Sequence, residues 1–152
     1  MSSPTQVQPT QVQSPLNLML TVAEGQNLAM ITYVLSQSAV IDAGLNAVGT
    51  VHFARFLPEP GFTSNPPTSQ ILWVLTEYDG TFDQYIQDFV TQMGEVFNTL
   101  LSYVADPPPL PVEKNLAAFG QWVSSHNQPS NLYSAYPACT VQMILNGGCP
   151  LA

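Results

Sequence analysis

The chain is poor in charge, and above all in positive charge. Only 8% of its 152 residues are charged, ten acids stand against two bases, and the formal net charge is -8. Ordinary soluble domains carry about 25% charged residues. Because so acidic a surface repels phosphate groups, we expect neither nucleic acid nor an anionic membrane as a partner. With 45% hydrophobic residues, the surface must be built of uncharged polar residues or be covered by another subunit. The second alternative predicts a homodimer or higher homo-oligomer.

Several sequence signals are also missing. No apolar run has the length of a membrane-spanning helix, and no basic segment followed by an apolar one opens the chain. We therefore expect a cytoplasmic protein. There is no glycine-rich phosphate loop, no Gly-x-Ser-x-Gly motif and no dinucleotide fingerprint, so ATP, NAD and serine-hydrolase chemistry are set aside.

Cysteine is scarce, with Cys139 and Cys149 as its two representatives. In a reducing cytoplasm we expect two free thiols, with a disulfide between them as the alternative. Without a neighbouring pair of histidines they make a poor zinc site, and we expect no metal.

The first fifteen residues differ from the rest. The sequence PTQVQ occurs twice, at 4–8 and again at 9–13, without charge or apolar periodicity. This composition predicts a disordered or extended tail over 1–15. The alternative is an arm that lies along a partner subunit. Residues 16–152 then form one domain, long enough for a sizeable core.

The first half of that domain contains three predicted strands. Apolar residues alternate over 16–22, which predicts a strand. A helix over 26–40 follows, with Leu28, Ile31 and Leu35 as its inward stripe. Two strands over 48–57 and 70–78 are separated by a proline-rich hairpin loop.

The second half begins with the most regular helix. Thr81 is a good N-cap, and apolar residues recur at helical spacing from 82 to 104. We expect a shorter helix over about 111–125, a last strand over 131–136, and a short helix from 141 to 145 capped by Thr140.

This order of elements predicts an α+β fold. It matches the ferredoxin-like split βαβ arrangement, with a four-stranded antiparallel sheet, helices on one face and extra C-terminal helices. The middle strands are apolar on both faces, so the helix-free face also needs a cover. Two sheets packed face to face form a dimeric α+β barrel. The space between them is a dry core or a cavity for an apolar small molecule.

The second and third strands also carry a resemblance. Val51–Phe56 reads VHFARF and Glu77–Asp83 reads EYDGTFD. With the predicted order of elements over 16–145, they resemble the dimeric α+β barrel superfamily, and within it small catalase-like proteins and relatives of dye-decolorising peroxidases. Such peroxidases carry Gly-x-x-Asp-Gly, which Asp79-Gly80 matches here, with Thr76 in place of the first glycine. The resemblance implies haem as a candidate cofactor; from the residues themselves we expect none.

Two residues are candidates for catalysis, His52 and Asp79. His52 lies within an apolar strand, where it could act as a general base; the alternative is a neutral histidine bonded to the strands around it. We expect it near Thr76 or Tyr78. Asp79 could act as an acid or base beside Glu77, and its alternative is a turn-forming aspartate.

Four residues are candidates for ligand binding. Arg55 could clamp a carboxylate; its alternative is an ion pair with an acid on a nearby helix or strand, or with Asp79 or Glu77. By strand alternation it faces away from His52 unless a β-bulge intervenes. Phe56, Trp73 and Tyr78 would suit a flat apolar ligand, although such residues usually belong to a core or an interface.

The sequence thus leaves three functions open. The first is a binding or assembly module with an apolar space between two sheets. The second is a cofactor-independent monooxygenase or cyclase that uses His52 as its base, and the third is a haem peroxidase-like protein.

Overall fold

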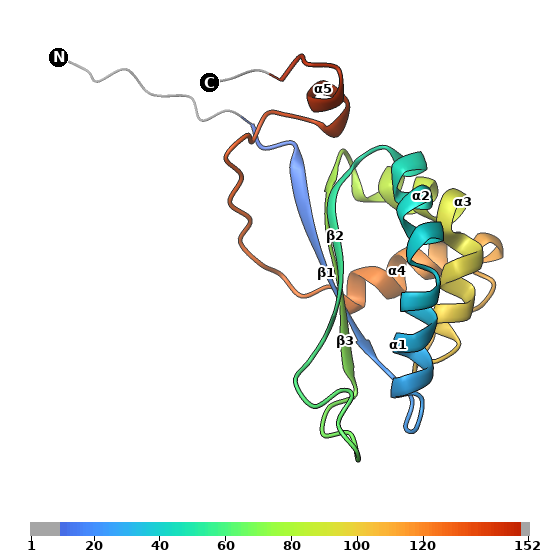
Figure 1. Ribbon diagram of the computed structural model, residues 1–152. Coiled ribbons are helices and arrows are strands. Elements are labelled where there is room, and N and C mark those ends of the chain that lie inside the picture. The colour runs from blue at the N-terminus through green and yellow to red at the C-terminus, as the bar shows by residue number, and fades with distance from the viewer. Residues whose placement is uncertain (1–9, 150–152) are drawn as a thin grey trace.

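A three-stranded antiparallel sheet with helices packed on one face forms the structure, a computed structural model that describes residues 10–149. The strands are β1 (Gln13–Thr21), β2 (Val51–Pro58) and β3 (Ile71–Asp79), and β3 lies between the other two. Figure 1 shows all the helices but the last on one side of the sheet, and the last, short helix beyond the end of the strands. The helices are α1 (Asn27–Ser36), α2 (Ser38–Val48), α3 (Phe82–Leu101), α4 (Leu116–His126) and α5 (Val141–Leu145), with a 3-10 turn η1 (Val112–Lys114).

The main core lies between α3 and the sheet. The side chain of Thr81 accepts the backbone N–H of Gln84 at 3.2 Å, which confirms the predicted N-cap. One side of the helix is buried as its periodicity predicts, and the strands supply the facing layer. The core includes Tyr85, Phe89, Met93, Phe97 and Leu100 of α3 with Leu16, Leu18, Leu20, Leu72 and Val74 of the sheet.

The helix predicted over 26–40 is wrong in extent and orientation. The structure has two helices, α1 and α2, which meet at Gln37 with a bend of 64°. Leu28 and Leu35 were expected to face inward but are 73% and 68% exposed. The buried side chains are Asn27, Met30, Val34, Ile41 and Val48. A polar residue, Asn27, opens the inward stripe, so apolarity alone indicated the wrong face.

Strand β2 contains a β-bulge at His52. Val51 pairs with Tyr78 of β3, and Phe53 pairs with the adjacent Glu77, so His52 is the extra residue. From Phe53 onward the alternation is regular. Because of the bulge, Val51 packs against the core while Phe53 points away from it.

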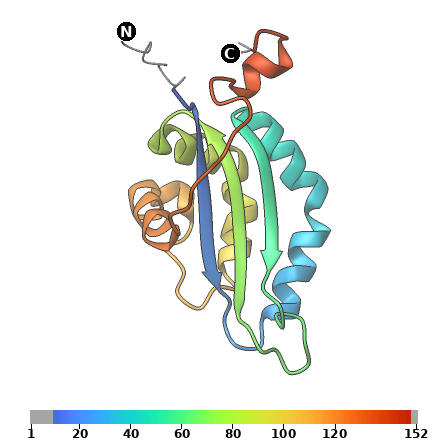
Figure 2. The same ribbon diagram turned by 90° about the vertical axis from the view of Figure 1, so that its left-hand side faces the viewer.

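The predicted fourth strand over 131–136 is not formed, and the sheet has three strands within the described range. The chain after α4 nevertheless runs antiparallel beside β1, with an isolated bridge between Leu18 and Asn127 and a bond from the Val12 N–H to the Pro137 carbonyl of 2.8 Å. Pro129 and Pro137 have no N–H to give, which keeps this segment from pairing regularly. Figure 2 looks onto the helix-free side and shows it crossing toward α5.

The expectation of two free thiols is wrong, because Cys139 and Cys149 form a disulfide with a Cα–Cα distance of 5.2 Å. The chain turns back after α5 at Gly147, whose φ of 72° is left-handed. That reversal returns Cys149 to Cys139. Sequence spacing alone did not indicate the turn.

The N-terminal prediction is tested only at its end. Residues 1–9 lie outside the described part of the chain, whereas β1 begins at Gln13, inside the predicted tail. No single helix within residues 10–149 is both long and apolar enough to span a bilayer. Helices α1 and α2 taken together have the length and composition of a spanning segment, but a bend separates them.

Candidate functional site

His52 and Asp79, both selected from the sequence, lie in contact at one end of the sheet. The Nε2 atom of His52 is 2.7 Å from Oδ1 of Asp79, and the two side chains are 10% and 7% exposed. The bulge in β2 sets this geometry, because it frees His52 from the strand alternation. The expected neighbours Thr76 and Tyr78 are therefore replaced by the last residue of β3.

The second carboxylate oxygen of Asp79 is also engaged. Oδ2 accepts the backbone N–H of Val141, the first residue of α5, at 2.7 Å. With both oxygens of Asp79 accepting, Nε2 of His52 is the donor, and a neutral ring then presents Nδ1 as its acceptor. The role of Val141 was missed from the sequence. The only local signal was the Thr140 cap, which the structure confirms with a bond of 3.1 Å from the Met143 N–H.

The end of the sheet is covered by residues 138–149, which we call the C-terminal cap. The cap is tied to β1 by Gln13, whose Nε2 donates to the Cys139 carbonyl at 2.7 Å. It is tied to the residue after α2 by Gln142, whose Nε2 donates to the Gly49 carbonyl at 2.9 Å. The His52–Asp79 pair thus joins two strands and the cap.

Arg55 and Trp73 lie on the helix-free side of the sheet, which we call the open face. By register its strand residues are Pro15, Asn17, Met19, Thr21, Phe53, Arg55, Leu57, Ile71, Trp73, Leu75 and Glu77. Trp73 donates its Nε1–H to Glu59 at 3.1 Å. The predicted ion pair of Arg55 with Asp79 or Glu77 is not formed, and its exposed guanidinium has no acidic partner among residues 10–149.

Phe56 and Tyr78 belong to the opposite, helix-covered side. Phe56 packs against the core, and Tyr78 stacks on Tyr85 with ring centroids 4.3 Å apart. Burial raises the pKa of Tyr78, and it raises the pKa of Tyr85 to about 12. The four predicted ligand-binding residues are therefore divided between the two faces of the sheet and do not form one pocket within a single chain.

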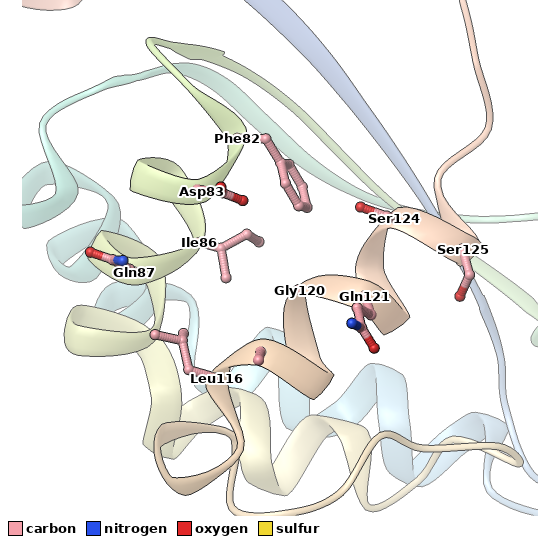
Figure 3. A pocket seen from close by; sticks show the side chains of 10 residues that line it. Phe82, Asp83, Ile86, Gln87, Leu116, Gly120, Gln121, Ser124 and Ser125 are labelled. Carbon is pink, nitrogen blue, oxygen red and sulfur yellow. The ribbon is translucent and has the colours of Figure 1, made fainter.

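A groove that the sequence did not indicate lies between α3 and α4. Its volume is about 770 Å³, and Figure 3 shows Phe82, Ile86 and Leu116 around it with polar side chains at the rim. A Cβ added at Gly120 would lie 3.9 Å from Ile86, an ordinary contact distance, so the groove has room for a small side chain there. Among the described residues, Asp83 is the only charged one that lines it, so the groove disfavours an anionic ligand. None of the predicted site residues lines this groove.

Comparisons of the chain with models of protein families, with curated proteins and with solved structures found no match. The resemblance to dimeric α+β barrels and to peroxidase-like proteins therefore stays a prediction. Within the described part of the chain, no three histidine, cysteine or acidic side chains lie close enough together to hold a metal ion.

Proposed function

We propose that the protein is an assembly module in which two copies pack their open faces together. The observation that carries this proposal is the exposure of Phe53 and Leu57 on that face, at 73% and 45%. By register Leu57 lies opposite Trp73, and Leu75 lies diagonally between Phe53 and Leu57. A contiguous apolar surface of this kind is typical of an interface.

Charge supports a second copy as the occupant. The chain carries a net charge of -8, and most of its surface would repel an identical surface. The strand residues of the open face include one base, Arg55, and one acid, Glu77, and the carboxylate of Glu59 meets this face at Trp73. The face therefore carries little of the negative charge of the chain. In a two-fold symmetric dimer both copies use the same surface for the contact. Arg55 of each copy can then pair with an acidic residue of the other copy.

Such a contact would give the dimeric α+β barrel predicted from the sequence. The chain beside β1 runs where a fourth strand of a ferredoxin-like sheet would lie, and this supports that topology. Two packed sheets lie about 10 Å apart, which leaves either a dry core or a narrow space for an apolar small molecule. Arg55 and Trp73 would face that space. A cytoplasmic location stays part of the proposal, and in that reducing compartment the Cys139–Cys149 disulfide would be a reversible one.

The test is the oligomeric state with two matched variants. Native mass spectrometry of the wild type should give a dimer, with any co-purified small molecule as added mass. Phe53→Glu should give a monomer, because it would bury two carboxylates in the contact. Leu28→Glu, at an equally exposed position on α1, should remain dimeric. A wild type that stays monomeric at tens of micromolar would contradict the proposal.

The His52–Asp79 geometry favours a second candidate, an enzyme of the cofactor-independent type. An aspartate that holds Nε2 orients the ring and leaves Nδ1 as a base. His52→Ala should then abolish turnover while the dimer persists. The haem peroxidase-like alternative has less support, because both oxygens of Asp79 are already engaged. A Soret band in the purified protein would support it.

A further inference from the structure

Apart from the fully buried Cys139, the C-terminal cap is held on the protein with little apolar burial. None of the side chains of α5 is buried, and Met143, Ile144 and Leu145 are 39%, 49% and 73% exposed. A helix of five residues is not stable by itself in water. The position of the cap must therefore depend on other interactions.

The cap is closed into a loop by one covalent bond and joined to the sheet by a few polar contacts. The Cys139–Cys149 disulfide joins its two ends. Hydrogen bonds reach it from Asp79, Gln13 and Gly49. Water can replace each such hydrogen bond at a small net cost once the segment is free to move. The disulfide opposes this movement indirectly, because a closed loop gains less conformational entropy than an open chain when the cap becomes disordered.

The cap covers the polar end of the sheet. Asp79 and Gln13 are 7% and 8% exposed although both are polar, and both bond directly to the cap. Removing the cap would return an oxygen of Asp79 to water. The hydrogen-bonded His52 would then lie at an accessible surface.

We propose that the disulfide is a redox latch: its reduction releases the C-terminal cap and uncovers the His52–Asp79 pair. This inference goes beyond the proposed assembly and does not depend on it. A dithiol reductant gives two electrons and two protons, the S–S bond breaks into two thiols, and the reductant becomes a cyclic disulfide. Cys139 is fully buried whereas Cys149 is only half-buried, so the reductant reaches the bond from the side of Cys149.

The test compares the oxidised protein with protein treated with dithiothreitol. Labelling of carboxyl groups by a water-soluble carbodiimide and an amine, read by mass spectrometry, reports on Asp79. The exposed Asp83 is an internal control four residues away. We expect reduction to increase the labelling rate of Asp79 roughly tenfold and to leave that of Asp83 unchanged. Hydrogen exchange should quicken over 138–149 and stay slow in α3.

Two variants separate the latch from the other contacts. Cys149→Ser cannot form the disulfide and should behave as the reduced protein under all conditions. Gln142→Ala removes one hydrogen bond to the cap but keeps the disulfide, and should behave as the oxidised wild type. Circular dichroism verifies that each variant is folded.

Three results would overturn the proposal. The first is an Asp79 that stays protected although alkylation shows both cysteines reduced. The second is a loss of protection in α3 together with the cap, since that is general unfolding. The third is a Cys149→Ser variant that folds and keeps slow exchange over 138–149.

Discussion

At the scale of single residues, Tyr85 places an ionisable hydroxyl in the core. It stacks on Tyr78, and its hydroxyl lies 3.2 Å from Oγ1 of Thr76. Burial raises its pKa to about 12, so the folded state keeps the proton at a pH where the unfolded state has lost it. The stabilising effect of the neutral hydroxyl is complete below pH 10, the usual pKa of tyrosine, and is lost as the pH rises toward 12.

We therefore predict a loss of about 2–3 kcal/mol in the free energy of unfolding between pH 9 and 12, from Tyr85 alone. Burial raises the pKa of Tyr78 as well, which adds to the loss in the same direction. Urea unfolding of the wild type and of Tyr85→Phe measures it, and the variant should lose less. Tyr133→Phe, at a side chain 85% exposed, is the control. Equal losses in wild type and Tyr85→Phe would contradict the prediction.

The candidate site shows which single residues could be predicted from the sequence and which contact could not. His52 and Asp79 were both predicted as site residues, because each has a local sequence signal. His52 is a histidine within an apolar strand, and Asp79 stands at the end of the next strand. Their contact was not predicted. It depends on a bulge of one residue in β2, and neither glycine nor proline occurs within two residues of His52 to mark one.

At the scale of elements, Asn27 ties the start of α1 to the hairpin loop between β2 and β3. Its side-chain amide donates to the carbonyls of Phe62 and Ser69, at 2.8 and 2.9 Å, and is almost fully buried. These two bonds fix a loop with several prolines against the end of the helix.

Asn27→Ala should lower the free energy of unfolding by about 2–4 kcal/mol, because it leaves two carbonyls without their donor. Asn46→Ala, at an exposed position on α2, should change it by less than about 0.5 kcal/mol. Chemical denaturation measures both variants. If Asn27→Ala costs no more than the control, the amide is not what holds the loop.

Elements differ in how well the sequence predicted them. Helix α3 and its N-cap residue Thr81 were predicted well, because the N-cap, the apolar periodicity and the prolines that end the helix are all local signals. The orientation of α1 was predicted wrongly, because the polar residue Asn27 occupies a buried position on its inward side. The strand over 131–136 failed because pairing along β1 needs N–H donors at the right register, which the prolines at 129 and 137 interrupt.

At the scale of the whole molecule, low charge and two-sided strands predicted an open apolar face, and the structure contains one. The order of the three strands also follows from the sequence, because a long hairpin makes β2 and β3 neighbours. The C-terminal cap could not be predicted. It lies where it does through contacts of residues more than sixty positions apart, such as Val141 with Asp79, and no local pattern encodes them.

The bond between Val12 and Pro137 has a mechanical consequence. It places the beginning of β1 beside the chain that leads to the C-terminus, so a pull on the two ends would open their contacts one after another, as in a zipper. We expect this segment to yield at low force in single-molecule stretching. The disulfide would transmit the force directly from Cys139 to Cys149, so the residues between them would not be stretched. The fully extended oxidised chain should therefore be shorter than the reduced one by about 30 Å, at roughly 3.5 Å for each enclosed residue.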